Sequence, residues 1–303
     1  MDRDAGLTDP GLAVDRSIPF IDAHHHVWEL ARFPYAWLTG TLQDDLLGDY
    51  RALGVDWSPA RLYREFYGQN VVKSVHVEAD SNAPDPVDET AWLESVARSG
   101  GHPHAIVVMC DIRESGAERE LARHLDASRR VRGVRIREHP DDPTDGAFEA
   151  GYRALGRHGL SYELNASPGA LGRAAGFIGA NPAVRVLVGH AGLPVQRDPA
   201  YFATWRAEMA ALAAIDHVSC KVSGFATVDH SWTVESLRPW VLACVDLFGP
   251  DRIVFGTDWP VASLFSTYVE TVDAWRRIID EAGFSRPEQE AMLFRNAERL
   301  YSI

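Results

Sequence analysis

Residues 18–26 read IPFIDAHHH, a short apolar run that ends in three consecutive histidines. The run has the length and the bounding proline of a buried strand. Side chains of a strand alternate between its faces, so His24 and His26 share one face and His25 points away. Two neutral imidazoles on one face can chelate a divalent metal such as zinc. The stretch therefore predicts a strand that carries part of a metal site, with a hydrogen-bonded pair of core histidines as the structural alternative.

Seven further apolar runs follow the first one along the chain. They begin at Val71, His104, Val131, Leu160, Ala183, His217 and Asp251. Apolar residues at three- and four-residue spacing indicate helices between them, over 86–99, 114–128, 146–158, 168–180, 199–215, 234–248 and 265–282. Eight alternations predict an α/β fold of the (β/α)8 TIM barrel type in a single domain. A doubly wound open sheet is the alternative, but no G-x-G-x-x-G follows the first run.

Two other segments complete the predicted architecture. Residues 1–17 are rich in Asp and Gly without periodicity, which predicts a flexible N-terminal arm before a barrel over 18–303. Residues 28–68 are irregular and dense in aromatic rings, beginning with Trp28. Such a loop either folds over a cavity or covers one end of the barrel. A capping box at Ser285 and Glu288 marks the start of a closing helix.

Composition excludes several classes of function. The net charge of −13 argues against a nucleic-acid partner. No stretch reaches the roughly 20 apolar residues of a membrane span, and the first residues lack the apolar core of a secretion signal, so we expect a cytoplasmic location. The three cysteines are far apart and indicate no disulfide framework. We expect a small-molecule substrate as partner, and the oligomeric state stays open, with a homodimer as one option.

Polar residues end most of the predicted strands, where the active site of such a barrel lies. The candidates are His24, His26, His76, Glu78, Arg135, Arg137, His190 and Asp258. A barrel without a function has little reason to gather so many polar groups at one end. Structural alternatives are a salt bridge from Glu78 to Arg135 or Lys221, and a helix cap by Asp258.

The motifs DAHHHVWELARFPYAWL, VHVEA, GVRIRE, VLVGHAG, CKVSG, VFGTDWP and NAERLYSI occur in order across nearly the whole chain. Together they resemble the lactonase-type branch of the amidohydrolase superfamily, which includes sugar-acid lactonases and 2-pyrone-4,6-dicarboxylate lactonase. The resemblance implies a hydrolase on a barrel, with His24, His26, His190 and Asp258 at positions used for metal binding and proton transfer. The bridging lysine or glutamate and the fifth-strand histidine of two-metal members are missing, so we do not expect a binuclear centre.

These observations lead to one main functional hypothesis. We expect hydrolysis of the ring ester of a small polar lactone, either a sugar-acid or a dicarboxylate lactone, assisted by one divalent metal, zinc or manganese. Metal-independent activity stays open, because some relatives are thought to work without metal. The alternatives are a metal-dependent decarboxylase on the same scaffold and a barrel that only binds a small molecule.

Each candidate residue has an expected role. The expected metal ligands are His24, His26, Glu78 and Asp258. Asp258 is the expected general base, and His190 is expected to be a ligand or to polarise the carbonyl group. Four residues are expected to bind substrate, namely Arg135, Arg137, His76 and Trp28.

Overall fold

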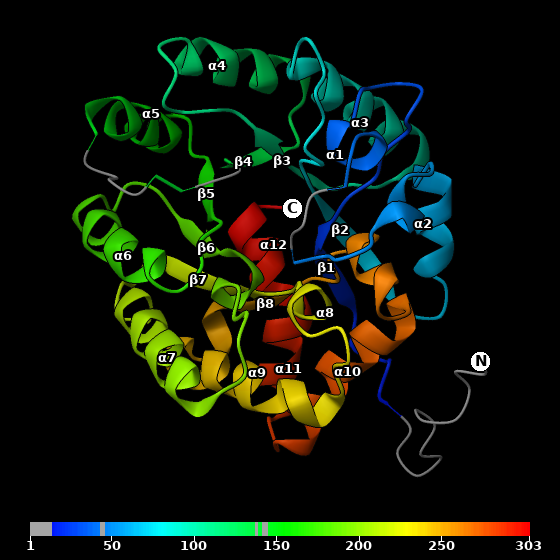
Figure 1. Ribbon diagram of the computed structural model, residues 1–303, viewed down its shortest axis with the longest axis vertical. Coiled ribbons are helices and arrows are strands. Elements are labelled where there is room, and N and C mark those ends of the chain that lie inside the picture. The colour runs from blue at the N-terminus through cyan, green and yellow to red at the C-terminus, as the bar shows by residue number, and fades with distance from the viewer. Residues whose placement is uncertain (1–13, 43–45, 137–138, 141–144) are drawn as a thin grey trace.

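Eight parallel strands form the centre of the molecule in the computed structural model, which describes residues 14–42, 46–136, 139–140 and 145–303 (Figure 1). The strands follow one another around the sheet in chain order. They are β1 (Phe20–His25), β2 (Val71–Val77), β3 (Ala105–Met109), β4 (Val131–Arg135), β5 (Ser161–Leu164), β6 (Val186–Val188), β7 (Val218–Val222) and β8 (Ile253–Phe255). Just beyond β8, Asp258 N–H donates to the carbonyl of His24 and closes the ring. The predicted (β/α)8 barrel is confirmed.

Helices surround the strands on the outside (Figure 1). The seven long ones are α3 (Val87–Gly100), α4 (Ala117–Ala127), α5 (Gly146–Arg157), α6 (Ala170–Ala180), α7 (Pro199–Ala213), α9 (Val234–Phe248) and α10 (Tyr268–Glu281). Short helices α1 (Ala36–Thr39), α2 (Pro59–Glu65) and α8 (Phe225–Val228) lie in the connections. Thr233 and Thr267 start α9 and α10 with capping boxes, which satisfy backbone N–H groups that a first turn leaves open.

The end of the chain closes the barrel from the inside. After α11 (Arg286–Glu290) and a π-helical turn (Ala291–Arg295), helix α12 (Asn296–Tyr301) projects within the ring of strands in Figure 1. Its Leu300 and Tyr301 pack with Ile21 and Val75, which point into the barrel. The predicted capping box at Ser285 is present. The closing helix thus fills the interior rather than only covering the outer wall.

Residues 14–17 lie along α10 and are tied to it by polar contacts. Arg16 forms an ion pair with Asp273, and Arg276 donates to the backbone carbonyls of Asp15 and Ile18. The rest of the predicted N-terminal arm, residues 1–13, lies outside the described residues. In the described part of the chain, no helix has the length and apolarity needed to cross a membrane.

Candidate active site

Three buried side chains converge at the carboxyl end of β1 and just beyond β8. Nε2 of His24 lies 3.2 Å from Nε2 of His26, and Oδ1 of Asp258 lies 3.5 Å and 3.4 Å from these two atoms. Tetrahedral zinc holds its ligands at about 2.0–2.1 Å, which places neighbouring ligand atoms roughly 3.3 Å apart. The three atoms therefore have the spacing of three corners of a zinc site. They form the one group of this kind within the described residues.

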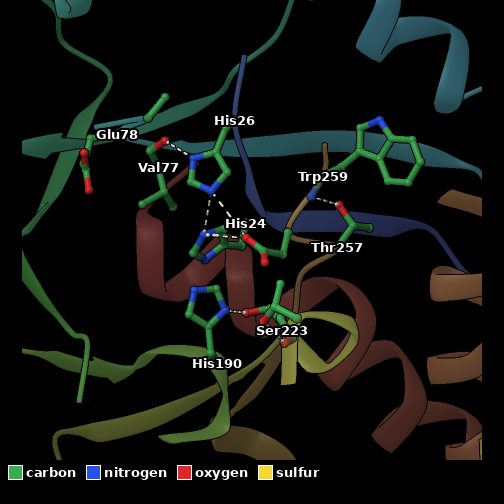
Figure 2. A network of polar contacts seen from close by, with 12 residues as sticks. His24, His26, Val77, Glu78, His190, Ser223, Thr257 and Trp259 are labelled. Atoms are coloured by element: carbon green, nitrogen blue, oxygen red, sulfur yellow. Dashed lines mark hydrogen bonds and ion pairs between the residues drawn. The ribbon is translucent and has the colours of Figure 1, made fainter. Parts of the chain in front are cut away.

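The hydrogen-bonding of His26 prepares its ring for metal binding. Its Nδ1 lies 2.8 Å from the carbonyl oxygen of Val77, which can only accept, so Nδ1 carries the hydrogen (Figure 2). Nε2 then presents a lone pair toward His24 and Asp258. Burial, together with the nearby His190, holds the pKa of His24 well below its usual value, so the ring of His24 stays neutral. Neutral imidazoles are the form that binds metal.

Asp258 keeps its negative charge although it is buried. Burial alone would raise its pKa, but the neighbouring His190 and His26 favour the ionised form, and the pKa of the carboxyl group lies below its usual value. The residue adopts a left-handed backbone conformation with φ 59°. Such a conformation is uncommon outside glycine and is often found where a side chain must be aimed at a site.

His190 stands beside this group on the turn after β6. Its ring centroid lies 4.5 Å from that of His24, and its Nδ1 lies 3.0 Å from Oγ of Ser223 (Figure 2). Burial lowers the pKa of His190 to about 4, so the ring is neutral near pH 7. A glycine at position 224 lets the next turn approach, since a Cβ there would lie 2.4 Å from Nδ1 of His190.

A cavity of about 320 Å³ opens above these residues. Its lining includes His26, His190 and Asp258, and also Glu78 and Arg135. Nε of Arg135 lies 2.6 Å from Oε1 of Glu78, and a second nitrogen of the guanidinium donates to the Glu78 backbone carbonyl at 2.8 Å. The volume is that of a site for one small molecule. A water molecule and a carbonyl group placed here would lie beside both the imidazoles and the carboxylate.

Comparison with known proteins agrees with this geometry. A family model described as Amidohydrolase matches residues 21–303. The chain belongs to the amidohydrolase family. This membership confirms the hydrolase class and the resemblance seen in the sequence motifs.

Relatives of this amidohydrolase cover nearly its whole length. An uncharacterised protein, y4mH, from Sinorhizobium fredii is 32% identical over 94% of this chain and 99% of its own. The L-fucono-1,5-lactonase of Burkholderia multivorans is 28% identical over 93% of this chain and 96% of its own. A crystal structure of an amidohydrolase from Burkholderia multivorans with bound zinc has a TM-score of 0.79 at 27% identity, covering 94% of this chain and 99% of that one.

The amidohydrolase brings six of the predicted site residues to the candidate metal group or the cavity beside it. His24, His26 and Asp258 form the candidate metal group, and His190 and Arg135 line the cavity beside it. Glu78 lines the cavity too, but it lies outside the metal group and its Oε1 is bound to Arg135. The salt bridge from Glu78 to Arg135, considered from the sequence as a structural alternative, is present.

Three predicted substrate-binding residues are placed elsewhere or lie outside the description. His76 is fully buried, because Val75 and Val77 point into the barrel and the residue between them faces the opposite way. Trp28 is also fully buried, and its Nε1 donates to the carbonyl of Val55. Neither belongs to the cavity lining. Arg137 lies outside the described residues.

Several lining residues were not among those predicted. They are Trp37, Leu46, Leu47, Ala79, Asp80, Asn165, Leu193, Thr227 and Val261. The aromatic density of residues 28–68 pointed to a cavity cover, and Trp37 is the ring from that segment that reaches the cavity, with Trp28 behind it at 5.6 Å between centroids. Leucine and valine in connections carry no periodic signal, so the sequence could not single them out.

Proposed function

We propose that this amidohydrolase opens the ring ester of a small lactone by water attack, with one divalent ion, zinc or manganese, bound by His24, His26 and Asp258. The observation that carries the proposal is the convergence of the two Nε2 atoms and Oδ1 within 3.5 Å of one another at the floor of a cavity. The similarity to proteins named L-fucono-1,5-lactonase supports an ester ring as the target.

The residues present fit such an ion in donor type and in the spacing of their ligand atoms. When bound, the ion would polarise the ester carbonyl and lower the pKa of a water molecule. Glu78 is not proposed as a ligand, because its carboxylate already binds Arg135 at 2.6 Å. That pair instead holds one wall of the cavity in place.

Two side chains carry the proton transfer and charge stabilisation in this proposal. Asp258 is ionised and accepts a proton from the water whose oxygen bonds to the carbonyl carbon. When the ring C–O bond breaks, the same proton passes to the leaving alkoxide, and the product is a hydroxy acid. His190 faces the carbonyl oxygen and stabilises the charge that develops on it, held in position by Ser223.

The variant Asp258→Asn tests the role of the carboxylate. We expect kcat for lactone hydrolysis to fall about a hundredfold to ten-thousandfold, the usual contribution of a general base, with the circular dichroism spectrum and melting temperature retained. Asp246→Asn, at an exposed position on α9, is the matched control and should keep wild-type activity. Full activity in Asp258→Asn would disprove the assigned role. A wild-type enzyme that opens no lactone in a broad panel, but releases CO2 from an aromatic acid, would support the decarboxylase alternative.

Elemental analysis of the purified protein tests the metal part separately. We expect one divalent ion per wild-type chain and loss of that ion in His24→Ala, because two ligands do not hold it as tightly as three. His158→Ala, which changes the C-cap residue of α5 outside the cavity lining, should keep the ion. A metal-free wild-type protein that still hydrolyses lactones would overturn the metal assignment and leave the hydrolase intact.

A further inference from the structure

Asp22 is a buried carboxylate on β1 that takes no part in the proposed reaction and does not line the cavity. Ile21 and Ala23 belong to the cluster of side chains inside the barrel, so Asp22 between them points outward, toward α10. A carboxylate is costly to bury unless hydrogen bonds compensate for the water that it loses. The partners of Asp22 therefore indicate what it does.

Each oxygen of Asp22 accepts two hydrogen bonds. Oδ1 accepts from the backbone N–H of Thr257 at 2.9 Å and from that of His24 at 3.2 Å. Oδ2 accepts from the hydroxyl of Thr257 at 2.7 Å and from that of Tyr268 at 3.0 Å. His24 belongs to the candidate metal group, and Thr257 directly precedes Asp258, which also belongs to it. The carboxylate thus links the two chain segments that carry the group.

The same hydrogen bonds hold the chain on both sides of Asp258. The backbone N–H of Trp259 donates to the hydroxyl of Thr257 at 3.2 Å, and that hydroxyl donates to Asp22 (Figure 2). The N–H of Asp258 itself donates to the carbonyl of His24 at 2.8 Å. Asp258 has its left-handed conformation, φ 59°, between these fixed neighbours. Such a conformation persists only where the surrounding structure determines it.

We infer that Asp22 is a positioning residue, which acts through Thr257 to hold the carboxylate of Asp258 against Nε2 of His24. This inference rests on the proposed lactone hydrolysis and adds a residue to it. The distance that Asp22 controls is the 3.5 Å between Oδ1 of Asp258 and Nε2 of His24. A misplacement of about 1 Å can cost roughly a hundredfold in rate, so the loss of these hydrogen bonds should lower kcat.

The variant Asp22→Asn tests the carboxylate directly. It keeps the shape of the side chain, but its amide nitrogen cannot accept a hydrogen bond, so two of the four donors lose their acceptor in either orientation of the amide. We expect kcat for lactone hydrolysis and the affinity for Zn²⁺, measured by competition with a chelator, each to fall about tenfold to a hundredfold. KM should change little, because the pair of Glu78 and Arg135 on the cavity wall has no bond to Asp22.

Variants of Thr257 test the link to Asp258, also where Asp22→Asn does not fold. Thr257→Val keeps the size of the side chain and removes the hydroxyl, so we expect kcat and Zn²⁺ affinity to fall about tenfold. Thr257→Ser keeps the hydroxyl and should restore both values to near those of the wild type. Thr271→Val is the matched control, because it removes a buried threonine hydroxyl on α10 that bonds to the Thr267 carbonyl instead. It should lower the melting temperature and leave kcat and Zn²⁺ affinity unchanged.

The possible outcomes separate this inference from the proposed function. If Thr257→Val lowers the melting temperature as Thr271→Val does but keeps kcat and Zn²⁺ affinity, Asp22 serves the fold alone and the inference is overturned, while lactone hydrolysis stands. Equal losses of kcat in Thr257→Val and Thr257→Ser would overturn it too, because the hydroxyl would then not matter. A wild-type enzyme that opens no lactone would overturn the proposed function, and the Zn²⁺ affinities of the variants would still decide whether Asp22 positions the metal group.

Discussion

His190 and Asp258 both have left-handed backbone conformations, with φ of 49° and 59°. Residues other than glycine adopt this conformation at a cost, smaller for Asn, Asp and His than for most others, which the surrounding structure must offset. In this protein each of the two side chains faces the His24 ring or its Nε2 atom as a result. The turn after a strand thus decides where a catalytic side chain points, beyond the alternation within the strand.

Gly224 offers a test of how closely the His190 ring is positioned. It has φ 66°, and an added Cβ would lie 2.4 Å from Nδ1 of the ring. In Gly224→Ala we expect the ring to be pushed away from Ser223 and kcat/KM to fall tenfold or more, with a loss of about 1–3 kcal/mol in the free energy of unfolding from the strained backbone.

Gly176 in α6 is the matched control, because a Cβ there meets nothing within 4 Å. Gly176→Ala should leave kcat/KM unchanged and raise stability by about 0.5–1 kcal/mol. Activity assays and urea unfolding of the two variants give the comparison. Wild-type kcat/KM in Gly224→Ala would show that the position of His190 is not limiting.

The spacing of His24 and His26 was enough to predict their convergence, because both lie at the end of one strand, two positions apart, although the register of that strand against β2 shifts between Asp22 and His25. The same argument failed for His76 and Glu78. Strand β2 ends at Val77, so Glu78 leaves the alternation and reaches the cavity while His76 stays in the outer layer. Alternation predicts a face only as far as the strand extends, and the sequence does not mark its last residue.

At the scale of elements, the bounds of a helix were predicted most closely where a capping residue precedes the helix and a glycine follows it. Helix α9 occupies 234–248 as expected, because Thr233 caps its start and Gly249 follows its end. Strand β6 is only Val186–Val188, although the apolar run begins at residue 183. An apolar run shows that residues are buried but not where the ladder of hydrogen bonds begins. The apolar residues that line the cavity, such as Leu47 and Val261, could not be predicted, since connections lack any period.

Helices α3 and α4 are joined by a buried histidine whose protonation should affect stability. Nδ1 of His124 on α4 lies 2.8 Å from Oγ1 of Thr90 on α3. Burial lowers the pKa of His124 to about 4, against the attraction of Asp85. Glu120 lies 4.0 Å from Nε2, on the edge of an ion pair.

Because the folded-state pKa is depressed, the contribution of His124 to stability is fully present above pH 6.5 and is lost as the pH falls toward 4. Between pH 7 and pH 5 this contribution should fall by about 2 kcal/mol. We expect the pH dependence of the unfolding free energy in His124→Gln to be smaller than that of the wild type by this amount. Guanidinium unfolding at the two pH values measures the difference, and parallel curves for the two proteins would refute the assignment.

At the scale of the whole molecule, the last helix links the two halves of the barrel from within. The hydroxyl of Tyr301 on α12 donates to Oε1 of Glu163 on β5 at 2.6 Å. Oε2 of Glu163 lies 2.8 Å from Nζ of Lys221 on β7. All three side chains are buried. A buried carboxylate that is bonded on both oxygens stabilises the fold only while both partners remain.

Tyr301→Phe removes one of these partners and keeps the ring. We expect the free energy of unfolding to fall by about 1–3 kcal/mol, because one oxygen of Glu163 is left without a donor. Tyr67→Phe is the control and should be neutral, since Tyr67 is 90% exposed. Urea unfolding midpoints of the two variants decide the matter, and equal midpoints would mean that the hydroxyl contributes nothing.

The position of helix α12 also affects how substrate enters the enzyme and how product leaves it. Its side chains fill the barrel at the amino ends of the strands, next to Lys73, which forms an ion pair with Glu298 of the same helix. In the described part of the chain, substrate and product then share the opening of the cavity at the carboxyl ends of the strands. Each hydroxy acid has to leave by the route along which the next ester arrives. Product release must therefore precede the binding of the next substrate molecule.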